Sequence, residues 1–302
     1  MHRVPLPQRT HLEFTDPLRE LVRVARMMNA PTVPTHLDLT NCKFLSPLIL
    51  CGTAALLRAE QEAGLDSVAN IHCHQEGLRQ YLEITGYPEG YSQSDPTYSG
   101  KRLLAEFRTK NYIPLIRFEA SRPSDRDREE LIQSVERLLI DQCGLDGPLL
   151  NAVKYLISEI TTNITYHAGQ GSGFLLAQYY RSDQHLDLAI ADTGMGLRAN
   201  YLASGKWRPS DDVEALRLAL EGRSTKDRPD SRGFGIRTSR RMLVEGLNGQ
   251  FFYWSGSAML LNNADKENIF DLKDGTRYPG CYIAMRIPTV TDPSFNYLRF
   301  VE

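Results

Sequence analysis

One short segment of the chain carries polar residues at the spacing of a helix face. In SEITTNITYHA, residues 158–168, Glu159, Asn163 and His167 follow one another at intervals of four, so on a helix they share one face. Asparagine is a poor helix former, which hints at a role for Asn163. Its carbonyl oxygen, with the Glu159 carboxylate one turn away, could bind Mg²⁺, which takes oxygen ligands. A solvated helix face is the simpler explanation when this segment is taken alone.

A second segment joins an acidic residue to two glycines at the end of a predicted strand. In AIADTGMGL, residues 189–197, an apolar run leads into Asp192, Gly194 and Gly196. An aspartate in that place can accept a hydrogen bond from an exocyclic amine such as N6 of adenine. Glycines let the backbone approach a ligand closely and adopt positive φ. Ordinary turns use the same residue types, so this motif by itself has low specificity.

Two further glycines precede a predicted helix in SRGFGIRTSRRML, residues 231–243. Backbone N–H groups at a helix N-terminus suit phosphate, so Gly233 and Gly235 are candidates for a phosphate site, although an ordinary helix cap would look the same. Residues 198–241 contain eleven Lys or Arg and six Asp or Glu, whereas the whole chain has a formal net charge of -2. A basic loop between two glycine motifs predicts a lid over a polyphosphate.

An α/β arrangement must position these three motifs. In the C-terminal part, hydrophobic patterning predicts helices, a strand hairpin, a long polar loop and further strands. We expect strands at 112–119, 174–180, 185–191, 250–254, 258–261 and 280–287 and helices at 123–144, 148–167 and 235–245. The polar loop is expected at 197–232, with helical turns inside it.

The N-terminal part alternates short strands with helices, which predicts a small α/β domain over residues 1–90. Residues 91–111 belong to a stretch rich in Gly, Pro, Ser and Tyr and are expected to form a linker. A second domain then covers 112–290, and 291–302 form a C-terminal tail. In the first domain we expect strands at 35–39 and 67–72 and helices at 47–65 and 77–86.

Composition and charge narrow the class of protein. The chain has 302 residues, 41% of them hydrophobic, which is enough for one large domain or two ordinary ones. The low net charge argues against nucleic acid as a partner. The first residues lack the apolar run of a signal peptide, and no stretch approaches the roughly 20 apolar residues of a membrane span. Five cysteines without CxxC spacing fit reduced thiols. We therefore expect a cytoplasmic protein with no membrane partner.

In their order and surroundings, the three motifs resemble the GHKL (Bergerat-fold) superfamily of ATPases and kinases, which includes gyrase, Hsp90, histidine kinases and MutL. The resemblance covers about residues 110–290 and implies a two-layer α/β sandwich with a mixed sheet that binds ATP and Mg²⁺. It implies that Asn163 binds Mg²⁺, that Glu159 orients or activates the attacking group, and that Asp192 reads adenine. In the closing segment GCYIAMRIP, Cys281 stands where that superfamily usually has threonine. The glycines of the implied ATP pocket are Gly194, Gly196, Gly233 and Gly235, and the candidate basic contacts to phosphate are Lys226 and Arg232.

The strand at 113–119 and the helix after it look most like the anti-sigma-factor kinase branch of this superfamily. The N-terminal region resembles a STAS domain, the fold of anti-sigma-factor antagonists, through residues 37–50 (LDLTNCKFLSPLIL). That family's loop carries an aspartate followed by the phosphorylatable serine. Here Ser46 stands in the aspartate position and Pro47 in the serine position, so phosphorylation of this loop is not expected.

These resemblances imply a regulatory protein that phosphorylates a partner protein, or controls it in an ATP-dependent way, in the manner of anti-sigma-factor kinases. The alternative is a switch ATPase, in which Glu159 activates water and hydrolysis gates dimerisation or partner binding. Relatives of this superfamily often dimerise, which allows a homodimer. A histidine autokinase is disfavoured because no pair of H-box helices precedes the ATP domain. A nucleotide sensor without catalysis is disfavoured because a pure binding site needs no base such as Glu159.

Overall fold

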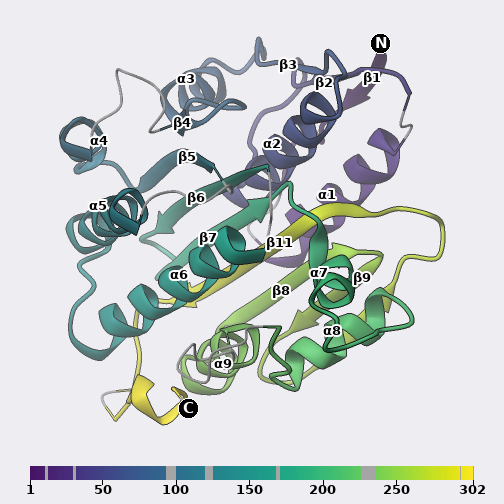
Figure 1. Cartoon of the computed structure of the whole chain (residues 1–302). Coiled ribbons are helices and arrows are strands. Elements are labelled where there is room, and N and C mark those ends of the chain that lie inside the picture. The colour runs from purple at the N-terminus through teal and green to yellow at the C-terminus, as the bar shows by residue number, and fades with distance from the viewer. Residues whose placement is uncertain are drawn as a thin grey trace.

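The computed structural model describes residues 1–10, 13–29, 32–92, 100–119, 125–167, 171–225, 235–292 and 294–301. Within these ranges the chain is a mixed α/β protein with a three-stranded and an eight-stranded sheet (Figure 1). The expected fold class is confirmed at this level. Among the described residues, no helix combines the length and the apolar character that crossing a bilayer requires.

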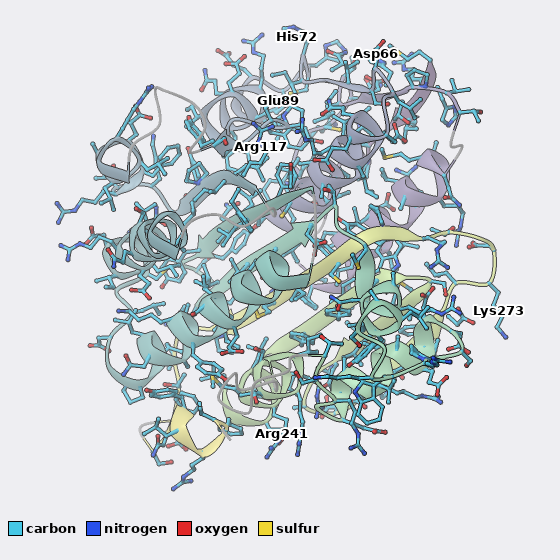
Figure 2. The ribbon with its side chains drawn as sticks, in the orientation of Figure 1. Asp66, His72, Glu89, Arg117, Arg241 and Lys273 are labelled. Carbon is cyan, nitrogen blue, oxygen red and sulfur yellow. The ribbon has the colours of Figure 1, made fainter. Side chains whose placement is uncertain are left out.

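The small sheet is parallel and belongs to the N-terminal region. Polar side chains such as Asp66 and His72 project from the outer edge of this region (Figure 2). The strands, in their order across the sheet, are β1 (His2–Pro5), β2 (Thr35–Asp38) and β3 (Val68–Asn70). The helices of the region are α1 (Thr15–Met28), α2 (Pro47–Glu62) and α3 (Glu76–Thr85).

Helix α2 begins at a well-formed cap. The Ser46 hydroxyl accepts a hydrogen bond from the Leu48 N–H at 3.2 Å, and Pro47 takes the first helical position, where a missing N–H costs nothing. Ser46 is itself 3% exposed, and its backbone N–H donates to Thr10 Oγ1 at 2.8 Å. Ser46 and Pro47 are therefore buried, whereas Asn41 and Lys43 of the preceding loop are exposed.

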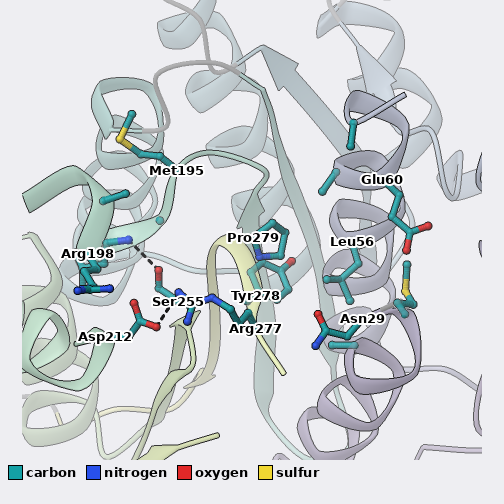
Figure 3. Close-up of a pocket in the computed structure, with 18 of the residues that line it drawn as sticks. Asn29, Leu56, Glu60, Met195, Arg198, Asp212, Ser255, Arg277, Tyr278 and Pro279 are labelled. Atoms are coloured by element: carbon teal, nitrogen blue, oxygen red, sulfur yellow. Dashed lines mark hydrogen bonds and ion pairs between the residues drawn. The ribbon is translucent and has the colours of Figure 1, made fainter. Parts of the chain in front are cut away.

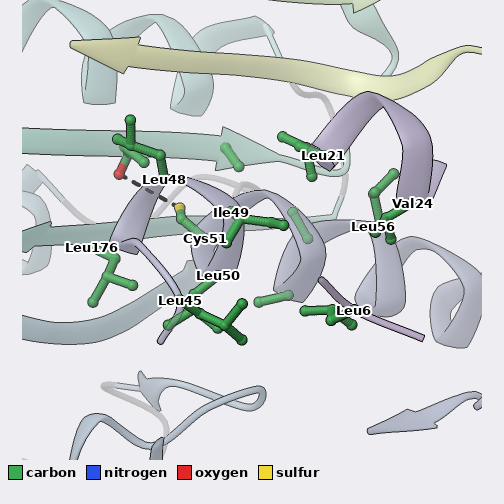
Figure 4. Close-up of a cluster of buried hydrophobic side chains, with 14 of the residues drawn as sticks. Leu6, Leu21, Val24, Leu45, Leu48, Ile49, Leu50, Cys51, Leu56 and Leu176 are labelled. Carbon is green, nitrogen blue, oxygen red and sulfur yellow. Dashed lines mark hydrogen bonds between the residues drawn. The ribbon is translucent and has the colours of Figure 1, made fainter. Parts of the chain in front are cut away.

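The same helix joins the N-terminal region to the large sheet. Every residue of α2 from position 47 to 57 is buried, because the helix packs both on α1 and on strands β6 (Ser172–Tyr180) and β7 (His185–Asp192). Figure 4 shows Leu48 and Cys51 of α2 beside Leu176 of β6. The Cys51 thiol donates a hydrogen bond to the carbonyl of Ala189 in β7 at 3.5 Å. One hydrophobic cluster thus includes side chains of both sheets.

The large sheet has the strand order β10-β9-β8-β11-β7-β6-β5-β4. Neighbouring strands are antiparallel except β4 and β5, which are parallel. The predicted hairpin is confirmed as β6 and β7. The remaining strands are β4 (Tyr91–Ser92), β5 (Tyr112–Glu119), β8 (Gln250–Gly256), β9 (Ala258–Asn262), β10 (Glu267–Asp271) and β11 (Tyr278–Pro288).

Each face of the large sheet is covered by a different part of the chain (Figure 1). In β7, Leu188 and Ile190 join the cluster formed with the C-terminal helices, whereas Ala189 and Ala191 join the cluster formed with α1 and α2. This alternation follows from the period of two in a strand. The C-terminal helices on the first face are α5 (Asp125–Cys143), α6 (Gly147–His167), α9 (Gly235–Arg241) and the π-helical η1 (Met242–Gly246).

A buried ion pair lies between the sheet and α1. The Arg286 guanidinium of β11 donates two hydrogen bonds of 2.7 Å to the carboxylate of Asp187 in β7, which is 1% exposed. The ring of Phe14, immediately before α1, lies 5.7 Å from the guanidinium. This ion pair links the neighbouring strands β7 and β11, and its guanidinium also lies against Phe14 of the N-terminal region.

Segments expected to be irregular contain regular structure. In the stretch expected as a linker, β4 pairs with β5, and α4 (Gly100–Phe107) packs on α5. The polar loop, in which helical turns were expected, contains two helices, α7 (Gly196–Ser204) and α8 (Asp212–Leu220). The expected tail contains the 3-10 turn η2 (Tyr297–Arg299), and Phe295 before it packs into the core.

Candidate functional site

The second motif of the sequence lies where strand β7 ends. Asp192 is the last residue of β7 and is 3% exposed. Side chains alternate along a strand, so Asp192 lies on the same sheet face as Leu188 and Ile190. This is the face covered by the C-terminal helices. Thr193 follows it and turns the other way, donating a hydrogen bond to Glu62 of α2 at 2.6 Å. The adjacent residues Asp192 and Thr193 therefore point to opposite sides of the sheet.

Two backbone amides hold the Asp192 carboxylate. The Gly194 N–H donates to Oδ1 at 2.8 Å, and the Cys281 N–H donates to Oδ2 at 3.2 Å. Burial raises the pKa of Asp192 to about 7, although both hydrogen bonds act to lower it. Each carboxylate oxygen can accept a second hydrogen bond. Asp192 is therefore a poorly solvated acceptor that retains capacity for a ligand donor.

The approach of strand β11 to Asp192 requires a glycine. A Cβ placed on Gly280 would lie 2.2 Å from Asp192 Oδ1 and 2.3 Å from the Asp192 carbonyl oxygen. No side chain fits at these distances, so Gly280 allows the next residue, Cys281, to present its N–H to the carboxylate. No role for Gly280 was predicted from the sequence, although this glycine begins the strand expected at 280–287.

The glycine loop after β7 is fixed by a serine of β8. Gly196 has φ +75, a conformation that favours glycine, and begins α7. The Leu197 N–H donates to Ser255 Oγ at 2.9 Å, and the Ser255 hydroxyl donates to the Gly280 carbonyl at 2.9 Å. Ser255 therefore ties the start of α7 to β11. Its role could not be predicted from the sequence, because a serine within a strand carries no local signal.

Cys281 lies next to Asp192, but its thiol is not activated. The Tyr253 hydroxyl donates to Cys281 Sγ at 3.0 Å. Burial first, and the negative charge of Asp192 second, raise the pKa of the Cys281 thiol to about 12. Because the thiolate is the nucleophilic form, this cysteine serves as a packing group and not as a nucleophile.

The first motif lies on α6, whose C-terminal end reaches the same end of the sheet as Asp192. Helix α6 ends at His167, β6 begins at Ser172, and Gly173 of β6 pairs with Asp192. Five residues span at most about 18 Å, which limits the separation between this helix end and the start of β6. Glu159 lies two turns before the helix end and is partly buried. Asn163 lies on the same helix, but its side chain falls outside the described part of the structure.

The third motif is described only from Gly235 onward. Gly235 is buried and begins α9, which contacts α6. Its neighbour Ile236 shares a small apolar cluster with Leu197, the residue after Gly196, and with Tyr201 of α7. Residues at the starts of α7 and α9 therefore pack against the same apolar cluster. The predicted contacts Lys226, Arg232 and Gly233 lie outside the described residues.

A pocket of about 540 Å³ opens on the other side of the glycine loop, between α1, α2 and α7 (Figure 3). Leu56 of α2 and Met195 form part of opposite walls. At its base, the Arg277 guanidinium pairs with the Asp212 carboxylate at 2.8 Å. Among the predicted site residues, Gly196 contributes to its lining. Residues of the N-terminal region and of the glycine loop thus line the same pocket.

Two further observations concern metal ligands and the similarity of the chain to known proteins. Within the described ranges, no group of three or more His, Cys, Asp or Glu side chains is arranged to hold a metal ion. Comparison of the chain with family models, curated proteins and solved structures gave no match.

Proposed function

We propose that this chain is an Mg²⁺-dependent ATP-binding regulatory protein that reads adenine with Asp192. The observation that carries the proposal is the buried Asp192 carboxylate at the end of β7, on the sheet face covered by the C-terminal helices and directly before the glycine loop that begins α7. Its order in the chain relative to the α6 motif and to Gly235 supports the same GHKL-like arrangement.

The chemistry of Asp192 favours adenine over guanine. Its oxygens are acceptors with unused capacity beyond the Gly194 and Cys281 amides. Adenine presents an amino group at the position where guanine presents a carbonyl oxygen. An amino donor would complete the hydrogen bonding of the carboxylate, whereas a carbonyl would place acceptor against acceptor. Discrimination of this kind is strong in buried sites, because the wrong ligand leaves polar groups unpaired.

The remaining parts of the site would act on the phosphates. In the proposed complex, Asn163 binds Mg²⁺, and the N-terminal turn of α9 with basic residues of the lid neutralises the phosphate charge. Glu159 would accept the proton of the attacking group, either a hydroxyl of a partner protein or water. A partner protein is the preferred acceptor, because Ser46 is buried and Pro47 has no hydroxyl in the chain's own STAS-like loop.

Calorimetric titration with ATP and GTP, each with and without Mg²⁺, tests this function. We expect binding of ATP, weaker binding of GTP by about tenfold or more, and tighter binding of ATP with Mg²⁺. Asp192→Ala should abolish the preference for adenine, and Asn163→Ala should abolish the effect of Mg²⁺. Asp183→Asn, at an exposed position in the turn between β6 and β7, is the matched control. Equal binding of ATP and GTP, or an Mg²⁺ effect that persists in Asn163→Ala, would contradict the assignment.

A second experiment separates the two acceptors of the γ-phosphate. The protein is incubated with ATP labelled at the γ-phosphate and with STAS-domain proteins as acceptors. Transfer to an added protein that stops in Glu159→Gln supports the kinase. Phosphate released to water without labelled protein, and lost in the same variant, supports the switch ATPase instead.

A further inference from the structure

The last residue of α2 bridges the start of strand β6 and the loop that follows β7. One carboxylate oxygen of Glu62 accepts a hydrogen bond from the Ser172 hydroxyl at 2.9 Å, and the other accepts from the Thr193 hydroxyl at 2.6 Å. Arg58, one turn earlier, donates to the first oxygen at 3.0 Å and to Ser172 Oγ at 3.3 Å. The Glu62 side chain is 27% exposed, and of its bonds to the two hydroxyls the one from Ser172 is the more buried.

Ser172 and Thr193 belong to the two chain segments that carry the proposed site. Thr193 lies between Asp192 and Gly194, and Ser172 begins the strand that follows helix α6. The segments are also joined directly, because the Thr193 N–H donates to the Ser172 carbonyl at 3.0 Å and the Ser172 N–H donates to Thr193 Oγ1 at 2.9 Å.

The preceding glycine makes this junction tight. Gly171 has φ +113, and a Cβ there would lie 2.4 Å from Thr193 Oγ1. The hydroxyl of Thr193 therefore occupies space that any other residue at position 171 would fill. Glu62, Ser172 and Thr193 form a compact polar junction, which we name the α2 clamp.

We propose that Glu62 is a positioning residue for the nucleotide site, acting through Thr193 on the Asp192 carboxylate and the Gly194 amide. This inference rests on the proposed ATP site. Asp192 and Thr193 face opposite sides of the sheet. The hydrogen bond that fixes the Thr193 side chain to α2 therefore also fixes the backbone that directs Asp192 toward the other side. The N-terminal region thereby becomes part of the nucleotide site, and a partner that shifts α2 changes the adenine contact.

The chain offers a matched control two residues earlier on the same helix. Glu60 accepts hydrogen bonds from Thr35 Oγ1 at 2.9 Å and from Ser67 Oγ at 2.5 Å, both within the N-terminal region. Glu60 and Glu62 are thus carboxylates of one helix with two hydroxyl donors each. Of these two glutamates, Glu62 is the one whose bonds reach the segments that carry the site.

The test compares Glu62→Ala with Glu60→Ala, and Thr193→Val with Thr193→Ser, in the full chain. Two quantities are measured for each variant: the Kd for ATP with Mg²⁺ and the hydrogen-exchange rates of the backbone amides at 193 and 194. Valine keeps the shape of threonine without its hydroxyl, whereas serine keeps the hydroxyl. We expect Glu62→Ala and Thr193→Val to raise the Kd about five- to tenfold and to speed exchange at both amides. Glu60→Ala and Thr193→Ser should stay close to wild type in both measurements.

The two readouts separate failure of this inference from failure of the proposed function. Wild-type Kd and exchange in Glu62→Ala would overturn the positioning role while leaving ATP binding intact. Faster exchange with an unchanged Kd would also overturn it, because the loop would then move without affecting the ligand. If the wild-type chain binds no nucleotide, the proposed function fails and the positioning role fails with it. In that case the exchange rates still show whether the α2 clamp holds the loop.

Discussion

Replacing Asp192 by asparagine removes one titrating group from the centre of the candidate adenine site and changes how stability depends on pH. Burial raises the pKa of Asp192 from 3.8 to about 7. The folded chain therefore holds a proton that the unfolded chain releases. Stability from this group is greatest below pH 3.8 and falls as the pH rises toward 7. Each pKa unit corresponds to about 1.4 kcal/mol.

Between pH 5 and pH 8, the wild-type chain should lose about 3 kcal/mol of unfolding free energy through Asp192 alone. The Asp192→Asn variant should lack this loss. Its amide nitrogen must face a backbone N–H of Gly194 or Cys281, which costs about 1–3 kcal/mol at every pH. At pH 5 the variant should therefore be less stable than wild type or equally stable. As the pH rises, its unfolding free energy should increase relative to that of wild type.

Urea unfolding of both proteins at half-unit steps from pH 5 to pH 8 measures this difference. All other titrating groups are shared, so they cancel when one curve is subtracted from the other. The unfolding free energy of Asp192→Asn minus that of wild type should rise with pH and level off above pH 7. Parallel curves would refute the reasoning, since they would mean that Asp192 is ionised in the folded chain throughout this range. Adenosine, which has no group that titrates near neutral pH, should bind about tenfold more tightly at pH 8 than at pH 6, because it needs the ionised carboxylate.

Two further changes test the packing around the site. Gly280→Ala places a Cβ 2.2 Å from Asp192 Oδ1 and should cost about 1–3 kcal/mol in urea unfolding, with loss of adenine preference. Gly77→Ala, at a glycine of α3 with open space around it, should be neutral or stabilising, and equal costs for the two would contradict the steric argument. Arg286→Ala leaves the buried Asp187 carboxylate without its partner and should cost about 3–5 kcal/mol in the same assay. Replacing both members by apolar residues should recover much of that loss, and no recovery would show that the pair contributes more than its burial costs.

Much of the C-terminal secondary structure was predictable from local patterns. Two consecutive strands joined by a polar turn predicted the hairpin of β6 and β7, and the glycines at 194 and 196 marked the loop before α7. Helix α1 was not predicted, although Leu18, Leu21 and Met28 are buried at helical spacing. Strand β10 was not predictable, because four of its five residues are exposed and it gains its strand form by pairing with β9 at the sheet edge.

The sequence by itself determined the order of the three motifs and the place of Asp192 at the end of a strand, because strand patterns and turn chemistry act over a few neighbouring residues. Only the tertiary structure decided what surrounds Asp192. Gly280 approaches it from a strand 88 positions later, and Glu62 reaches Thr193 from a helix 131 positions earlier. Such contacts depend on how whole elements pack, and a single carboxylate in α2 looks in the sequence like any other polar residue at a helix end. The burial that raises the pKa of Asp192 arises in the same way, from strands and helices that meet only in the folded chain.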